Sequence, residues 1–402
     1  MNTKLYLFHS NVENGFVYDD VLVISKHFNK VVLYCYNYDI NLPLLPNVEI
    51  NLIPKKIDYN LSLSQTIRLI FITFFDLFTI GTSLIYCKRF RFNLSLLKKS
   101  FILSKYIGDN LLSKHNNDPF LSFWFDEITL ALTFLKKDRK IKYLYTRAHG
   151  RDLFENREPL TGKLPFRCFV IRRLNKTFSV SAAGTNYLKK RYKKYSNKFF
   201  TQYLGSFDFG FNVNTENSKE FTLVSIAKVR NIKRVYLIAE ALYKVDIKIR
   251  WIHIGGDADL DSDTTMNRYF KAIEMLCQKN NIEFLNLGYL NHLDMINTLK
   301  NYRVNLLVSV SETEGLPVSM MEAISLGIPI LATKVGGCSE LVNNVTGVLL
   351  SENPDADEIA IEIKKIYDNQ LEFIKNKKLI RSFWESNFNI EHNYKLFSTL
   401  IK

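Results

Sequence analysis

The sequence predicts an α/β protein made of two doubly wound, Rossmann-like domains, and three observations predict it. The 402 residues are more than one ordinary core holds. Apolar strand-like runs alternate with segments of helical spacing through both halves, as in parallel sheets. A polar, non-periodic stretch, 207–220, separates the two series of alternating elements. Hydrophobic residues make up 47% and charged residues 23%, which excludes a disordered chain.

The first half begins with a β-α-β pattern, because the apolar run KLYLFH precedes a helical spacing and then the run KVVLYCY. Further along we expect helices and strands in alternation, at 101–114 (helix), 119–125 (strand), 126–136 (helix), 141–147 (strand), 177–181 (strand) and 183–194 (helix). We therefore expect a first domain over 1–206.

The second half alternates more clearly. We expect strands at 221–226, 247–254, 283–287, 304–310 and 330–333, with helices at 235–243, 265–279, 293–300 and 318–326 between them. This predicts a second domain over 221–385, joined by the linker 207–220 and followed by a helix over 386–402 that can cross back to the first domain. Such sheets bind ligands at the carboxyl ends of their strands.

The most apolar stretch is 69–86, which has about the length of a membrane span. Asp76 lies in its middle, and a charge at the bilayer centre is costly. Arg68 and the run KRFR at 88–91 flank the stretch, so an interfacial helix or hairpin fits better than a spanning helix. A buried pair of core helices is an equal alternative, since periodicity alone does not separate the two.

The net charge of +14 is concentrated in the first half. Residues 1–200 hold 32 Lys and Arg against 15 Asp and Glu, whereas 201–402 hold 22 against 25. This asymmetry indicates that the first half meets an anionic partner, such as a membrane surface, a phosphorylated substrate or nucleic acid. The five cysteines are dispersed, with no C-x-x-C pair, and no signal peptide is recognisable, so we expect reduced thiols in the cytoplasm.

The densest chemical signal is the segment SVSETEGLPVSMMEAISLGIPILATKVGGCSELVNNVTGVLL at 309–350. Glu314 follows a strand, Glu322 lies eight positions later in the next helix, and Gly315 allows backbone to approach a ligand. Carboxylates accept hydrogen bonds strongly and can hold sugar hydroxyls. Two isolated glutamates would more often be solvated surface acids.

Two further features fall at the same predicted sheet edge. Gly336 and Gly337 precede a short helix, where free backbone N–H groups can bind an anion. Lys228 and Lys233 follow the first strand of this half and can neutralise a diphosphate. A single lysine in a basic protein is usually solvated, but this half is near neutral.

The segment from Glu314 to Gly347 resembles the E-x7-E region of the retaining glycosyltransferases of family 4, which have the GT-B fold. The strand 222–226 with Ala227-Lys228 and Lys233 is similar to the diphosphate loop of that family. Looser resemblance to its bacterial capsule and O-antigen branch comes from PFLSFWFDE, RAHGRDLFE, LPFR and SAAGTNYL in the first half.

The resemblance implies two domains facing a cleft and a role for each matching residue. Glu314 would face the donor sugar and the departing phosphate, Gly315 and Leu316 would offer backbone to its hydroxyls, and Glu322 would hold the ribose. Lys228 and Lys233 would neutralise the diphosphate, with Gly336 and Gly337 at its other side. His149 would project from the first domain toward the reacting carbon; without the resemblance, a core histidine bonded to Asp152 is the better interpretation.

The family uses no metal or cofactor, and its co-substrate is a nucleotide-diphosphate sugar of the UDP or GDP type. The chain departs from the family pattern at Ala227-Lys228, where Gly-Arg is usual, and at Pro317, which lacks an N–H. The family often has a Gly-Gly turn after the first strand, and here only Gly15 is present. The acidic run 257–263 contains overlapping D-x-D, but it lacks the Gly and Glu of a calcium loop, so a solvated loop is expected.

The resemblance, together with the basic first half and the stretch 69–86, predicts a retaining glycosyltransferase that acts in bacterial surface polysaccharide biosynthesis at the inner face of the cytoplasmic membrane. The expected partners are a nucleotide sugar, a saccharide or lipid-linked acceptor and an anionic membrane surface, with no nucleic acid. A GT-B phosphorylase or nucleotide-sugar epimerase is the first alternative. A nucleic-acid-binding protein is a remote one, suggested by the charge and by 13% aromatic residues.

Overall fold

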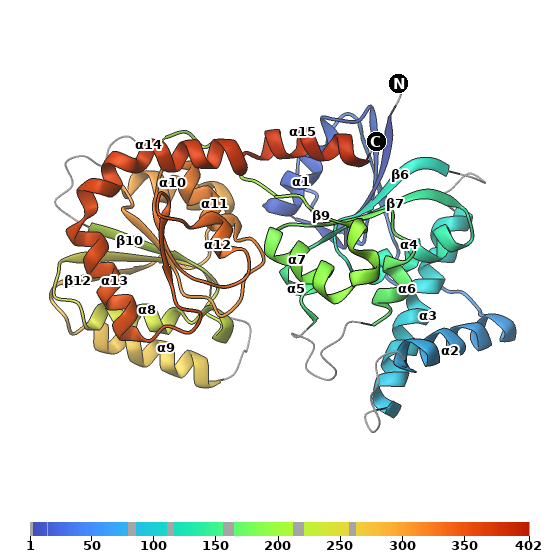
Figure 1. Ribbon diagram of the computed structural model, residues 1–402, viewed down its shortest axis with the longest axis horizontal. Helices are drawn as coiled ribbons and strands as arrows, with labels where there is room; N and C mark the ends of the chain where they lie inside the picture. The colour runs from blue at the N-terminus through green and yellow to red at the C-terminus, as the bar shows by residue number, and fades with distance from the viewer. Residues whose placement is uncertain are drawn as a thin grey trace. The chain divides into compact units, whose positions relative to one another are not determined.

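The computed structural model describes residues 3–13, 15–78, 86–110, 116–155, 165–211, 221–256 and 263–401. The chain forms two compact units, Met1–Gln202 with Tyr394–Lys402 and Tyr203–Asn393. Both units are α/β and built on parallel sheets (Figure 1), which confirms the predicted fold class. The boundary at 202/203 lies before the predicted 206, because Ser206 and Asp208 already bond to Trp384 and Arg381 of the second unit.

Unit 1 contains a seven-stranded parallel sheet. Its apolar runs 5–8 and 31–35 are buried because helices cover both faces of a parallel sheet. The spatial order is β5 (Val48–Leu52), β3 (Lys30–Cys35), β1 (Lys4–Phe8), β6 (Asn116–Ser122), β7 (Ile141–Ala148), β8 (Lys176–Ser179) and β9 (Phe199–Thr201). A separate pair is formed by β2 (Asn11–Val12) and β4 (Asn37–Tyr38).

The helices of unit 1 are α1 (Phe16–Ser25), α2 (Leu63–Phe78), α3 (Tyr86–Asn110), α4 (Glu127–Lys137), α5 (Gly150–Leu153), α6 (Arg167–Ile171), α7 (Ala182–Arg191) and the 3₁₀ helix η2 (Lys193–Lys198). Asp126 caps the N-terminus of α4 by accepting a hydrogen bond from the Ile128 N–H. Ser181 caps α7 in the same way, through the Gly184 N–H.

Unit 2 contains a six-stranded parallel sheet, one strand more than expected. The order is β12 (Ile282–Asn286), β11 (Ile249–Ile254), β10 (Phe221–Ile226), β13 (Leu306–Ser309), β14 (Ile330–Thr333) and β15 (Gly347–Leu350). The chain runs outward from β10 in one direction to β12 and then in the other to β15. Ligands bind beside such a reversal, at the carboxyl ends of the strands.

The helices of unit 2 lie on both faces of this sheet (Figure 1). They are η3 (Asn231–Lys233), α8 (Val235–Tyr243), α9 (Asp263–Leu276), α10 (His292–Asn301), α11 (Val318–Ser325), α12 (Cys338–Leu341), α13 (Ala356–Asp368) and α14 (Gln370–Asn387). The last helix, α15 (Ile390–Ile401), has its residues from Tyr394 onward in unit 1.

The apolar stretch predicted at 69–86 corresponds in part to α2, and residues 79–85 lie outside the described residues. One side of α2 is buried, with Leu69 and Thr73 fully inaccessible, whereas Phe71, Phe74 and Phe75 are exposed. Both carboxylate oxygens of Asp76 accept a hydrogen bond from the Phe166 N–H at 3.1 Å, which explains a charge in an apolar run. No helix among the described residues is long and apolar enough to cross a membrane.

A buried polar cluster attaches α15 to unit 1. The Arg147 guanidinium donates to Asp20 Oδ1 and to the Tyr394 hydroxyl, both at 2.5 Å, and it lies 4.3 Å from the centre of the Phe397 ring. His9 Nε2 lies 3.2 Å from Asp20 Oδ2. Arg147, beside Asp20, helps hold the pKa of that carboxyl below its usual value despite burial, so the pair is ionised within the core.

Candidate functional site

The loops that follow the strands of the second sheet meet at its carboxyl edge. Gly337 N donates to Gly315 O at 2.8 Å, and a Cβ placed on Gly336 would lie 2.0 Å from the carbonyl oxygen of Glu314. Gly336 has a φ of +53°, a conformation that glycine adopts without strain. The predicted glycine pair therefore packs directly against the predicted acidic loop.

Lys233 and Glu314 form an ion pair at this edge. Lys233 Nζ lies 2.5 Å from Glu314 Oε1, and both side chains are partly buried. Cys338 lies nearby, and its own burial, with a smaller contribution from the Glu314 charge, raises the pKa of the thiol to about 12. Cys338 is therefore a neutral packing residue at the start of the four-residue helix α12.

Glu322 is buried in α11 and accepts a hydrogen bond at 2.5 Å from His292 Nε2 of α10. The Phe209 ring packs edge-on against His292, with the ring centres 5.5 Å apart. His292 could not be predicted from the sequence, because a histidine at the start of a helix belongs to no motif.

The other predicted residues of this site occupy different environments. Lys228 is exposed in the loop after β10. The Leu316 side chain is buried, and Pro317 precedes the first residue of α11, a position that requires no N–H donor.

Arg234 is a second residue of the site that no sequence motif predicts. Its buried guanidinium donates to the carbonyl oxygens of Val310 (2.7 Å), Ser311 (3.1 Å) and Glu352 (3.1 Å). These contacts tie the Lys233 turn to the start of the acidic loop. A pattern of charges cannot distinguish such an arginine from the other cations of a basic chain.

His149, in unit 1, lies after β7 and is almost completely buried. Its ring packs against those of Phe123 and Trp124, with centre distances of 4.7 and 4.3 Å. The expected bond to Asp152 goes through the backbone, because Asp152 Oδ1 accepts from the His149 N–H at 2.5 Å while Nδ1 and Oδ2 are 3.9 Å apart.

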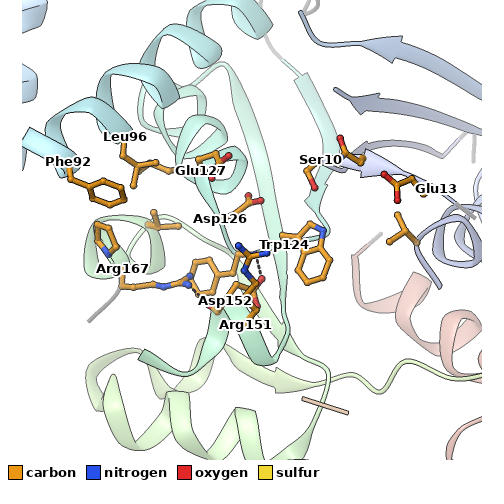
Figure 2. Close-up of a pocket in the computed structure, with 16 residues that line it drawn as sticks. Ser10, Glu13, Phe92, Leu96, Trp124, Asp126, Glu127, Arg151, Asp152 and Arg167 are labelled. Atoms are coloured by element: carbon orange, nitrogen blue, oxygen red, sulfur yellow. Dashed lines mark hydrogen bonds between the residues drawn. The ribbon is translucent and has the colours of Figure 1, made fainter. Parts of the chain in front are cut away.

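Unit 1 contains a pocket of about 690 Å³ that sequence reasoning missed (Figure 2). It is lined by the loops after β1, β6 and β7 and by parts of α3, α4 and α6, including Ser10, Phe92, Trp124, Asp126, Arg151 and Arg167. Burial, together with the charges of Glu127 and Asp152, raises the pKa of Asp126 to about 8. Asp126 is therefore protonated at neutral pH and can both donate and accept a hydrogen bond.

The fold is that of the GT-B glycosyltransferases. Over 99% of the chain, the structure superposes on sucrose-phosphate synthase from Thermosynechococcus elongatus with a TM-score of 0.71, 14% identity and 98% of that protein covered. It also superposes on HepE of Anabaena in complex with UDP, with a TM-score of 0.65, 14% identity and 99% of each chain covered. These likenesses establish the fold.

Part of unit 2 matches a known family by sequence. Residues 206–382 match the family model described as "Glycosyl transferases group 1". The O-antigen biosynthesis glycosyltransferase WbnH of Escherichia coli is 31% identical over 153 residues, 37% of this chain and 38% of that protein. An N,N'-diacetylbacillosaminyl-diphospho-undecaprenol alpha-1,3-N-acetylgalactosaminyltransferase of Campylobacter jejuni is 27% identical over 128 residues, 30% of this chain and 34% of that protein. The chain thus spans a little over a third of the length of the curated relatives it matches first.

Proposed function

We propose that the protein is a retaining, metal-independent glycosyltransferase of family 4. It transfers a sugar from a UDP or GDP sugar to a lipid-linked saccharide during bacterial surface polysaccharide biosynthesis. The observation that carries the proposal is the Lys233–Glu314 ion pair, which lies against the Gly336-Gly337 turn at the carboxyl edge of the second sheet. The O-antigen and lipid-diphosphate names of the relatives support the substrate class.

In this proposal unit 2 binds the donor. Lys233 and the exposed Lys228 neutralise the diphosphate as it departs, and Glu314 orders Lys233 before the donor arrives. Backbone groups of Gly315, Leu316 and the glycine turn contact the sugar and phosphates, and Glu322, oriented by His292, holds the ribose. Fixed cations at the leaving group stabilise charge that develops in the transition state, which supports a reaction without metal. Glu314 and His149 are the proposed catalytic residues.

Unit 1 is proposed to bind the acceptor at an anionic membrane surface on the cytoplasmic side. The support is its charge of 32 cations against 15 acids over residues 1–200 and the exposed aromatic face of α2. Aromatic side chains on one helix face and cations at the headgroups are typical of interfacial helices.

A transfer assay tests the proposal. The protein is incubated with a panel of UDP and GDP sugars and a synthetic undecaprenyl-diphosphate saccharide, with and without EDTA. We expect one donor to yield an elongated lipid-linked product that retains the anomeric configuration, unaffected by EDTA. Phosphate-dependent cleavage of a glycoside, or epimerisation of the donor without transfer, would instead indicate the phosphorylase or epimerase alternative.

A further inference from the structure

The pocket in unit 1 changes in chemical character along its length (Figure 2). Phe92 and Leu96 of α3 lie at one end, one helical turn apart on the same face, and Phe92 is 56% exposed. Ser10 and Glu13 lie at the other end, with Trp124, Asp126 and Arg151 between. The pocket is therefore apolar at the α3 end and polar at the strand end.

The middle of the pocket combines an aromatic ring, carboxyl groups and a cation. Trp124 is half-buried and Glu127 is exposed. Asp126 Oδ1 accepts a hydrogen bond from the Ile128 N–H at 3.0 Å. A protonated carboxyl group has one O–H donor and further acceptor positions, so Asp126 has capacity for a ligand. An aromatic platform beside hydrogen-bonding groups suits a sugar ring, because one face of a sugar is apolar and its edge carries hydroxyls.

Two arginines also line the pocket, Arg167 on the side of Phe92 and Arg151 near Asp126 and Trp124 (Figure 2). Arg167 is 7% exposed, and its guanidinium stacks on the Phe125 ring with 3.6 Å from Cζ to the ring centre. It also donates to the Asp152 carbonyl oxygen. Arg151 is exposed in α5. Guanidinium groups at this position match a phosphate that links an apolar chain to a sugar.

We propose that this pocket binds the junction of the lipid-linked acceptor lengthwise. The first units of the lipid lie on Phe92 and Leu96, the phosphate lies at Arg151 and Arg167, and the first sugar lies on Trp124 with its hydroxyls at Asp126 and Glu127. The inference rests on the proposed function for its choice of substrate, and it assigns α3 as the element that recognises the lipid.

Direct binding tests the assignment without a donor. The protein has three tryptophans, and the other two, Trp251 and Trp384, are completely buried, so ligand-dependent fluorescence reports on Trp124. The probes are alkyl maltosides and alkyl phosphates of six to ten carbons, used below their micellar concentrations, together with free maltose. We expect affinity to rise about fourfold per methylene in both alkyl series, and the signal to disappear in Trp124→Phe.

Matched variants separate the two ends of the pocket. Phe92→Glu should abolish the dependence on chain length and leave maltose binding unchanged, while Phe270→Glu, a substitution of an equally exposed phenylalanine on α9 of unit 2, should change neither. Arg151→Ala should weaken alkyl phosphates at least tenfold and alkyl maltosides by less than twofold. Equal effects of Phe92→Glu and Phe270→Glu, or no Trp124 signal with any probe, would overturn the inference. Transfer activity without this binding pattern would support the proposed function and contradict the pocket assignment. This binding pattern without transfer activity would support the pocket assignment and contradict the proposed function.

Discussion

Lys233 Nζ and Glu314 Oε1 lie 2.5 Å apart although 81 positions separate the two residues in the chain. Lys233 ends the turn after β10 and Glu314 follows β13, and these two strands are neighbours in the sheet. A cation held by a carboxylate in a partly buried site is positioned before a ligand arrives.

Lys233→Met should weaken binding of UDP or GDP, whichever the protein binds, by tenfold or more. The substitution removes a charge-assisted hydrogen bond of about 1.5–3 kcal/mol and keeps the apolar stem. Isothermal titration calorimetry measures the change. Lys244→Met is the control, because Lys244 pairs with Asp357 at 2.7 Å on the exposed surface of the same unit. Unchanged nucleotide affinity in Lys233→Met would exclude Lys233 from the donor site.

Gly336→Ala should lower the unfolding free energy by about 1–3 kcal/mol and reduce nucleotide affinity together. The added methyl group would meet the Glu314 carbonyl oxygen at 2.0 Å, and alanine is strained at the positive φ of this residue. Gly256→Ala provides the comparison, because the nearest atom to its new methyl group is 3.6 Å away. Chemical denaturation and calorimetry measure the two effects, and equal stability of the two variants would contradict the prediction.

Unit 2 should lose stability in acid through His253. This side chain is completely buried in β11, where Ser225 Oγ lies 2.9 Å from Nδ1, and burial lowers the pKa of His253 to about 4 from 6.5. Between these values the unfolded chain binds a proton that the folded chain does not, so stability falls as the pH drops from 6.5 to 4. The loss should be about 3 kcal/mol.

Urea unfolding from pH 7 to pH 4 measures this loss against His253→Gln. Other groups titrate alike in both proteins, so the informative quantity is the difference between the two curves. That difference should shrink by about 3 kcal/mol toward pH 4, and parallel curves would contradict the assignment to His253.

Replacing the three exposed phenylalanines of α2 should reduce membrane binding. The variant Phe71→Ser, Phe74→Ser, Phe75→Ser should float at least tenfold less with vesicles of phosphatidylglycerol and phosphatidylcholine, because each buried phenylalanine contributes about 1.5–3 kcal/mol. Phe270→Ser controls for exposed aromatic area, since Phe270 is 55% exposed on α9 of unit 2. Flotation of the native chain that ignores anionic lipid, or equal flotation of all variants, would count against an interfacial α2.

Sequence periodicity located most of the fold. The bounds of β10, α8 and β14 match the predicted ones to the residue, because each is a mainly apolar run with a charged residue or a proline close to each end. The strand β5 (Val48–Leu52) was missed, since it lies at the edge of its sheet and alternates apolar with polar residues over a short run. The strand β15 was missed because it begins at Gly347, a residue that weakens a strand pattern.

Part of the candidate site could likewise be predicted from the sequence, and part could not. Because parallel strands place their carboxyl ends at one edge, the proximity of Lys233, Glu314 and Gly336 could be expected from their order in the chain. The contacts of Glu322 with His292 and of Arg234 with three carbonyl oxygens could not, since they depend on side-chain directions across helices. The pocket at Asp126 was also beyond reach, because its polar and apolar walls come from separate segments of the first half.

The attachment of α15 has a consequence for synthesis on the ribosome. Arg147 and Asp20 are completed by Tyr394 and Phe397, which leave the ribosome only after all of 203–393 has been made. Until then the side of the Arg147–Asp20 ion pair that α15 covers stays exposed. Unit 1 can therefore complete its folding only after the whole chain has been synthesised. Until that point the nascent first half exposes apolar surface to which chaperones can bind.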